Sequence, residues 1–247
     1  MKKNMMVGAV FVAGALVLAG CGSEGAADDG ADTAATQAQA APTAVESTSA
    51  ADGNSQGQYT PAELQAALAA VKDKEGLTGA IADDAAVRAQ LPAATDALDG
   101  ITITPEACAE LATDRLAEKL ETGNFAIMQL SATDTVTLIS YEDESFIEGQ
   151  IASNEKQVAE CAEFQMEAGG QTFSTTGQEV PASSSADTTQ AFSVVTTGEG
   201  VSTEVIQVAG FSGTTVITVS MTDPADAAGA AAAGGQLVDA ILAELKG

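Results

Sequence analysis

The chain has 247 residues, with 35 acidic and 9 basic side chains and a formal net charge of −26. A surface this acidic repels nucleic acid and bare anionic lipid headgroups, so we expect no nucleic-acid partner. The sequence contains no His, which excludes Ser-His-Asp and Cys-His catalysis and His-ligated zinc.

The first twenty residues are typical of a secretory signal peptide. The dipeptide Lys2-Lys3 is followed by 16 uncharged residues, from 5 to 20. As a helix this run would be about 24 Å long, which is shorter than the ~30 Å hydrocarbon core of a bilayer. The run ends in Leu18-Ala19-Gly20-Cys21, which resembles a bacterial lipobox. That resemblance implies cleavage before Cys21 and diacylation of its sulfur, and two acyl chains give stable anchoring.

A polar, low-complexity tether follows the lipobox. Residues 22–57 include one Val and no Leu, Ile or aromatic residue. Such a segment buries too little apolar surface to offset the cost of ordering its backbone. The sequence therefore predicts a signal peptide at 1–20, a lipidated cysteine with a disordered tether at 21–58, and one folded domain at 59–247.

Helices are predicted in the first half of this domain. Thr60-Pro61-Ala62-Glu63 combines a capping box with a proline at the first helical position, and apolar residues then recur at helical spacing. A second helix is expected from 83 to about 91, where Pro92 breaks it. Thr104-Pro105-Glu106 repeats the capped start, and a third helix continues to about 121.

Strands dominate the second half. Runs rich in Val, Thr, Ile and Phe predict strands over 125–130, 135–141, 164–167, 172–180, 190–197, 203–209 and 214–221. Turns are expected at Gly169-Gly170 and Gly198-Glu199-Gly200. One helix is predicted over 151–161, and another, with a single apolar face, closes the chain after Asp226. This order predicts an α+β fold: an antiparallel sheet with helices packed mainly on one face, in a single domain.

Two cysteines remain once Cys21 carries the lipid. Cys108 and Cys161 form an even pair in an exported chain, which predicts a disulfide. The bond would join the start of the third predicted helix to the end of the helix over 151–161. A redox pair is the alternative, but the two residues lack C-x-x-C spacing and a neighbouring His.

Motif matches to hydrolases and metal sites fail on their context. Gly53-Asn54-Ser55-Gln56-Gly57 fits G-x-S-x-G, but it lies in the tether and no His base exists. Ser153-Asn154-Glu155-Lys156 fits the S-x-x-K of β-lactamases, but the S-D-N and K-T-G motifs are absent. The carboxylates of Glu142-Asp143-Glu144 lack the spacing of a calcium loop. We therefore expect no catalytic residue, no metal site and no cofactor.

The folded part resembles an actinobacterial family of exported domains, the PknH-like extracellular sensor domains. The resemblance is carried by Tyr59-Thr60-Pro61-Ala62-Glu63-Leu64, Ile103-Thr104-Pro105-Glu106-Ala107-Cys108, Val158-Ala159-Glu160-Cys161 and Val208-Ala209-Gly210-Phe211. Such domains occur on receptor Ser/Thr kinases and on free-standing lipoproteins. The resemblance implies an α+β fold that frames a cleft for a small ligand. The family's second disulfide, and its tryptophan near the later cysteine, are absent from this chain.

These observations predict a non-catalytic binding or sensor domain, lipid-anchored on the outer face of the cytoplasmic membrane. Its expected partners are the membrane, through Cys21, and a small molecule or envelope ligand, and we expect a monomer. Candidate residues to line a ligand cleft are Phe125, Met128, Tyr141, Phe146, Phe192 and Phe211. A lipid or glycolipid carrier with a large dry cavity is the alternative. An envelope enzyme would need a carboxylate pair or a Ser-Lys dyad, and the sequence shows neither convincingly.

Overall fold

The computed structural model describes residues 57–113 and 120–247; the expected signal peptide, Cys21 and the tether up to residue 56 lie outside them. The helices are α1 (Pro61–Glu75), α2 (Asp84–Asp99), α3 (Glu106–Thr113), α5 (Ser145–Glu160) and α6 (Ala227–Lys246). The strands are β1 (Ile81–Ala82), β2 (Ile101–Thr104), β3 (Asn124–Gln129), β4 (Thr135–Ser140), β5 (Glu163–Ala168), β6 (Gln171–Glu179), β7 (Thr188–Gly198), β8 (Val201–Ser212) and β9 (Thr215–Thr222). Over these same ranges, every helix is too short or too polar to cross a membrane.

Helix α1 forms where the sequence predicts it, for the expected reasons. The Thr60 hydroxyl accepts from the backbone N–H of Glu63, and the Glu63 carboxylate accepts from the backbone N–H of Thr60. The backbone N–H of Thr60, and after it the Thr60 hydroxyl, donate to the Glu63 carboxylate and hold its pKa below the usual value. Gly76 ends the helix in the left-handed conformation, with φ at 67°. Between the caps, Leu64, Leu68 and Val71 form the buried face.

The strands of the described residues form one nine-stranded sheet in the order β1-β3-β4-β9-β8-β7-β6-β5-β2. Every neighbouring pair is antiparallel. The turns at Gly169-Gly170 and Glu199-Gly200 have positive φ at both residues, as tight hairpins require. The predicted single α+β domain with an antiparallel sheet is confirmed.

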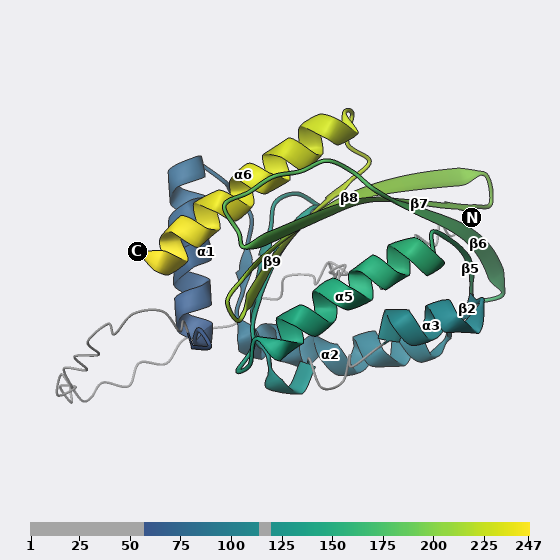
Figure 1. Ribbon diagram of the computed structural model, residues 1–247, viewed down its shortest axis with the longest axis horizontal. Helices are drawn as coiled ribbons and strands as arrows, with labels where there is room; N and C mark the ends of the chain where they lie inside the picture. The colour runs from purple at the N-terminus through teal and green to yellow at the C-terminus, as the bar shows by residue number, and fades with distance from the viewer. Residues whose placement is uncertain (1–56, 114–119) are drawn as a thin grey trace, which may run out of the picture. The chain divides into compact units, whose positions relative to one another are not determined.

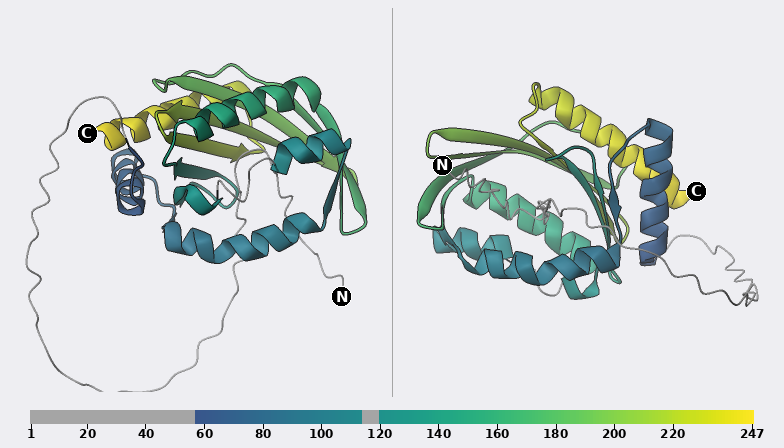
Figure 2. Two further views of the ribbon diagram at one scale, coloured as in Figure 1. Left: turned by 60° about the horizontal axis from the view of Figure 1, so that its bottom comes forward. Right: turned by 180° about the vertical axis from the view of Figure 1, so that it is seen from behind.

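Helices cover both faces of this sheet, whereas the sequence predicted helices mainly on one. Figures 1 and 2 show α1 and α6 against one face and α5 within the curve of the other. Around α1 and α6 the core includes Leu64, Val208 and Ile241, and under α5 it includes Phe211 and Val216. Because both faces are covered, β8 and β9 are buried at consecutive residues and lose the alternation of a half-exposed strand.

The first half of the domain differs from prediction in three places. Helix α2 was expected to end before Pro92, but it continues through the proline to Asp99. The proline removes one N–H donor, and because its position is exposed the helix tolerates this loss. The short strands β1 and β2, at the two edges of the sheet, were not predicted. Helix α3 is described to Thr113, and most of its expected continuation to 121 lies outside the described residues.

Candidate functional site

Helix α5 is fixed to the rest of the domain at both of its ends. At its start, Phe146 packs with Tyr141 and Phe211 against the sheet, and the rings of Tyr141 and Phe146 stack at 5.2 Å between centroids. At its end, Cys161 forms a disulfide with Cys108 of α3, with a Cα–Cα distance of 5.6 Å. The predicted disulfide is therefore confirmed, and it closes one end of the space beneath α5.

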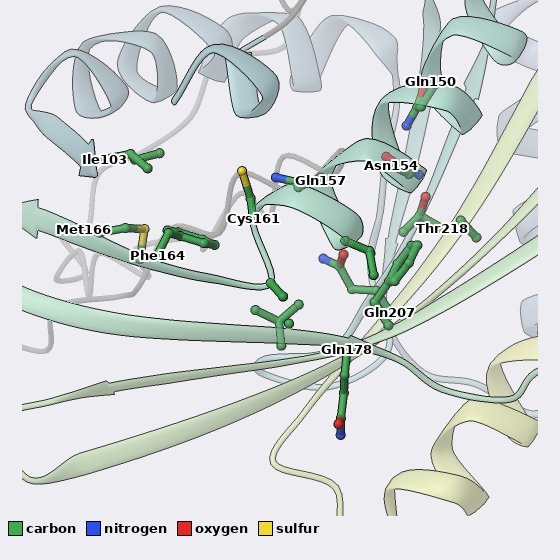
Figure 3. Close-up of a pocket in the computed structure, with 16 residues that line it drawn as sticks. Ile103, Gln150, Asn154, Gln157, Cys161, Phe164, Met166, Gln178, Gln207 and Thr218 are labelled. Atoms are coloured by element: carbon green, nitrogen blue, oxygen red, sulfur yellow. The ribbon is translucent and has the colours of Figure 1, made fainter. Parts of the chain in front are cut away.

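Between these two attachments, a cavity lies between α5 and the sheet. We call it the α5 cleft; it has a volume of about 860 Å³, part of which is open to solvent. Its walls come from α5, β2 and strands β5 to β9 (Figure 3). The residues that line it are Ile103, Gln150, Asn154, Gln157, Val158, Cys161, Ala162, Phe164, Met166, Gly177, Gln178, Phe192, Val194, Gln207, Ala209 and Thr218.

Side-chain amides supply most of the polar groups in this lining. Gln150 on α5 is 4% exposed, and its Oε1 has no hydrogen-bond partner among the described residues. Gln207 on β8 is 5% exposed, and Figure 3 shows its amide directed into the cavity. Asn154 is held in place, since its Nδ2 donates to Oε1 of Gln190 on β7 at 2.9 Å. The Gln178 side chain, by contrast, points away from the cavity.

The lining carries no ionised group. It contains no Asp, Glu, Lys or Arg, and the sulfur of Cys161 is held in the disulfide. Beneath the start of α5, burial raises the pKa of Tyr141, so this phenol is neutral at physiological pH. In the two described ranges, no three His, Cys, Asp or Glu residues group closely enough to hold a metal ion. The α5 cleft is thus a neutral cavity in an acidic protein.

The structure places the six candidate cleft residues in different surroundings. Phe192 lines the α5 cleft. Tyr141, Phe146 and Phe211 form the neighbouring packed cluster at the start of α5. Met128 lies in the core on the opposite face, under α1 and α6. Phe125 is buried beneath the guanidinium of Arg88, which lies 5.3 Å from the ring centroid. Cys21 lies outside the described residues.

Sequence reasoning missed the amides of the cleft: the sequence groups three of them on one helix face and carries a direct signal for Gln207 alone. Gln150, Asn154 and Gln157 recur at positions i, i+4 and i+7, which places them on one face of a helix. Gln207 interrupts the otherwise apolar run Val205-Ile206-Gln207-Val208-Ala209 in a strand. A polar residue at such a position is informative, since glutamine is mostly exposed in folded proteins.

Comparison with known proteins assigns no family to the chain. Neither the protein-family models nor the curated proteins give a match. Among solved structures, the chain is similar to the extracellular domain of PknH from Mycobacterium tuberculosis, with 13% identity and a TM-score of 0.45. That similarity covers 76% of this chain and 97% of the PknH domain. The sequence identity and the TM-score are both low, and the likeness assigns neither a ligand nor an activity.

Proposed function

We propose that this chain is a non-catalytic binding domain, tethered outside the cytoplasmic membrane by a lipid on Cys21, which holds a small organic molecule in the α5 cleft. The observation that carries the proposal is Oε1 of Gln150, a buried acceptor without a partner at the wall of an apolar cavity. An unpaired buried polar atom costs about 1–3 kcal/mol. A ligand that donates a hydrogen bond to this oxygen removes that cost on binding.

The chemistry of the walls supports binding without catalysis. General acid–base catalysis needs a group that exchanges protons near the working pH, and nucleophilic catalysis needs an activated side chain. Thr218 is the one hydroxyl among the described lining residues, and no lining residue is a base that would activate it. The residues of the cleft therefore favour reversible, non-covalent binding.

The lipobox sequence supports the location and gives a direct test. We expect the mature chain to begin at Cys21, with diacylglycerol on its sulfur. Mass spectrometry of the N-terminal peptide and labelling with an alkyne analogue of palmitate measure this. Cys21→Ala should abolish the label and retain residues 1–20, whereas Cys108→Ser should keep the label. A wild-type chain that starts elsewhere, or carries no lipid, contradicts the proposed anchor.

Gly177 offers a way to fill the α5 cleft from its wall. A Cβ at this position would meet no atom within 4 Å, and its register partner on β7 is Val194, another lining residue. Gly177→Trp should therefore place its indole in the cavity and weaken binding of a small neutral probe, 1-naphthalenemethanol, by about tenfold or more. Isothermal titration of the full-length lipoprotein in phosphatidylcholine nanodiscs, corrected with empty nanodiscs, measures the affinity.

The next residue along β6 provides the matched control. Gln178→Trp adds the same side chain on the opposite face of the strand and should leave the affinity unchanged. The chain has no native Trp, so the fluorescence emission wavelength reports where each new indole lies. The indole of Gly177→Trp should be shielded from solvent, and that of Gln178→Trp should be exposed. If the probe does not bind, or if both variants bind it as the wild type does, the proposed binding site is wrong.

A further inference from the structure

Two side-chain amides face the α5 cleft from opposite walls, and neither has all of its hydrogen-bonding groups paired with described residues. Gln150 on α5 and Gln207 on β8 are each more than nine-tenths buried. Oε1 of Gln150 has no partner, and none of the side-chain hydrogen bonds among the described residues involves Gln207. Each carboxamide group contains two N–H donors and an acceptor oxygen. The cleft thus offers donors and acceptors on both sides of its occupant.

A third amide is already oriented. Asn154 donates through Nδ2 to Gln190, whose own Nε2 donates to the backbone oxygen of Ile151 at 3.4 Å. This pair of contacts ties the middle of α5 to β7 and fixes the plane of the Asn154 amide. Oδ1 of Asn154 accepts from no described residue and is left as an acceptor at the cavity wall. Fixing such groups before a ligand arrives lowers the cost of ordering them on binding.

The absence of charge from these walls determines which ligands fit. An anion entering the cleft would lose its hydration without gaining a cationic partner, and the surplus of 26 negative charges repels it. A cation is attracted to the surface of the protein, but it would also lose its hydration in the cleft, where no carboxylate replaces the lost water. An uncharged molecule exchanges hydrogen bonds with water for hydrogen bonds with the amides.

We infer that the α5 cleft selects an uncharged ligand with an apolar part and several hydroxyl or amide groups, of which one lies between Gln150 and Gln207. This inference rests on the proposed function and specifies the class of molecule bound. The apolar part would contact Phe164, Met166 and Phe192, and the hydroxyl or amide groups would satisfy the amides. A sugar attached to an aromatic or aliphatic group has this chemistry.

The test compares probes that share a naphthyl group and differ in charge. They are 1-naphthyl β-D-glucoside, which is neutral, 1-naphthyl sulfate, which is an anion, and 1-naphthylmethylammonium, which is a cation. Titration into the full-length lipoprotein in phosphatidylcholine nanodiscs, at a salt concentration that screens the surface, should show the glucoside binding at least about tenfold more tightly than either ion. Gly177→Trp should weaken the binding of the glucoside, which places it in the cleft.

A substitution at Gln207 separates hydrogen bonding from apolar contact. Gln207→Leu keeps the approximate size of the side chain and removes its donors and acceptor. We expect it to weaken glucoside binding by about tenfold, the effect of one lost hydrogen bond, and to leave 1-naphthalenemethanol within about threefold of wild type. Gln178→Leu, which changes an amide that points away from the cavity, is the matched control.

The stability of the unliganded protein gives a second readout. Because no hydrogen bond from a described residue holds the Gln207 side chain, Gln207→Leu should leave the urea midpoint unchanged or raise it. A lowered midpoint would show that the amide serves the fold rather than the ligand, and it would overturn the inference. The inference also fails if naphthyl sulfate or naphthylmethylammonium binds as tightly as the glucoside, even where 1-naphthalenemethanol binding still responds to Gly177→Trp. If Gly177→Trp does not weaken 1-naphthalenemethanol binding, the proposed function itself fails, which is a different outcome.

Discussion

The double substitution Cys108→Ser with Cys161→Ser is expected to lower the free energy of unfolding by about 4 kcal/mol. The two cysteines are 53 positions apart, and the disulfide restricts the unfolded chain by closing that long loop. Since small domains are stable by roughly 5–15 kcal/mol, this loss is a large share of the total. Urea unfolding, followed by far-ultraviolet circular dichroism, measures it. Cys21→Ser, which removes the third cysteine, should not change the midpoint.

The same substitution should also weaken binding, for a reason that is separate from global stability. The disulfide attaches the end of α5 to α3, and Cys161 itself lines the α5 cleft. Without the bond, α5 is still held against the sheet by the cluster around Phe146 and by the hydrogen bonds of Gln190 with Asn154 and with the backbone oxygen of Ile151. Affinity for 1-naphthalenemethanol should fall under conditions where the variant is still folded. By linkage, bound probe should slow reduction of the wild-type disulfide by dithiothreitol, and equal rates with and without probe would contradict this coupling.

Local sequence signals predicted most of the secondary structure. The capping box at Thr60, the glycine turns and the Val- and Thr-rich runs each depend on a few adjacent residues, so one sequence is enough to read them. The disulfide was predictable because only two cysteines remain after the lipobox. The edge strand β2 was not, since its four residues are extended only through long-range pairing, such as Ile103 with Met166 of β5.

The assignment of helices to faces, and the cleft itself, depend on contacts between distant segments. The amides at 150, 154 and 157 lie along one side of a helix, and a sequence alone suggests that such a side faces solvent. In the structure the curved sheet places Gln207 and Phe192 opposite them. The aromatic residues chosen as candidates from their type mainly serve packing, as the Tyr141–Phe146 stack shows. Along such a helix side, the sequence does not distinguish polar residues that are exposed from polar residues that face a cavity.

The glycines of α6 give the second large expected effect, because helix propensity and packing predict opposite signs. In a helix interior, Gly→Ala normally stabilises by about 1 kcal/mol. At Gly235, however, a Cβ would lie 2.2 Å from the backbone oxygen of Ser183, in the segment between β6 and β7. That segment is held on α6, since the Ser185 N–H donates to the Asp239 carboxylate. A backbone carbonyl so fixed cannot rotate away as a side chain does.

Packing should therefore outweigh propensity, and Gly235→Ala is expected to lower the free energy of unfolding by about 2 kcal/mol. Gly229→Ala, in the first turn of the same helix, is the matched control. There the three atoms nearest to the Cβ all belong to the Asp226 side chain, which can turn aside, and the residue is exposed. This variant should gain up to about 1 kcal/mol, so the two urea midpoints should move in opposite directions. A rise for both would mean that the segment through Ser183 yields freely, and that the close approach to α6 contributes little to stability.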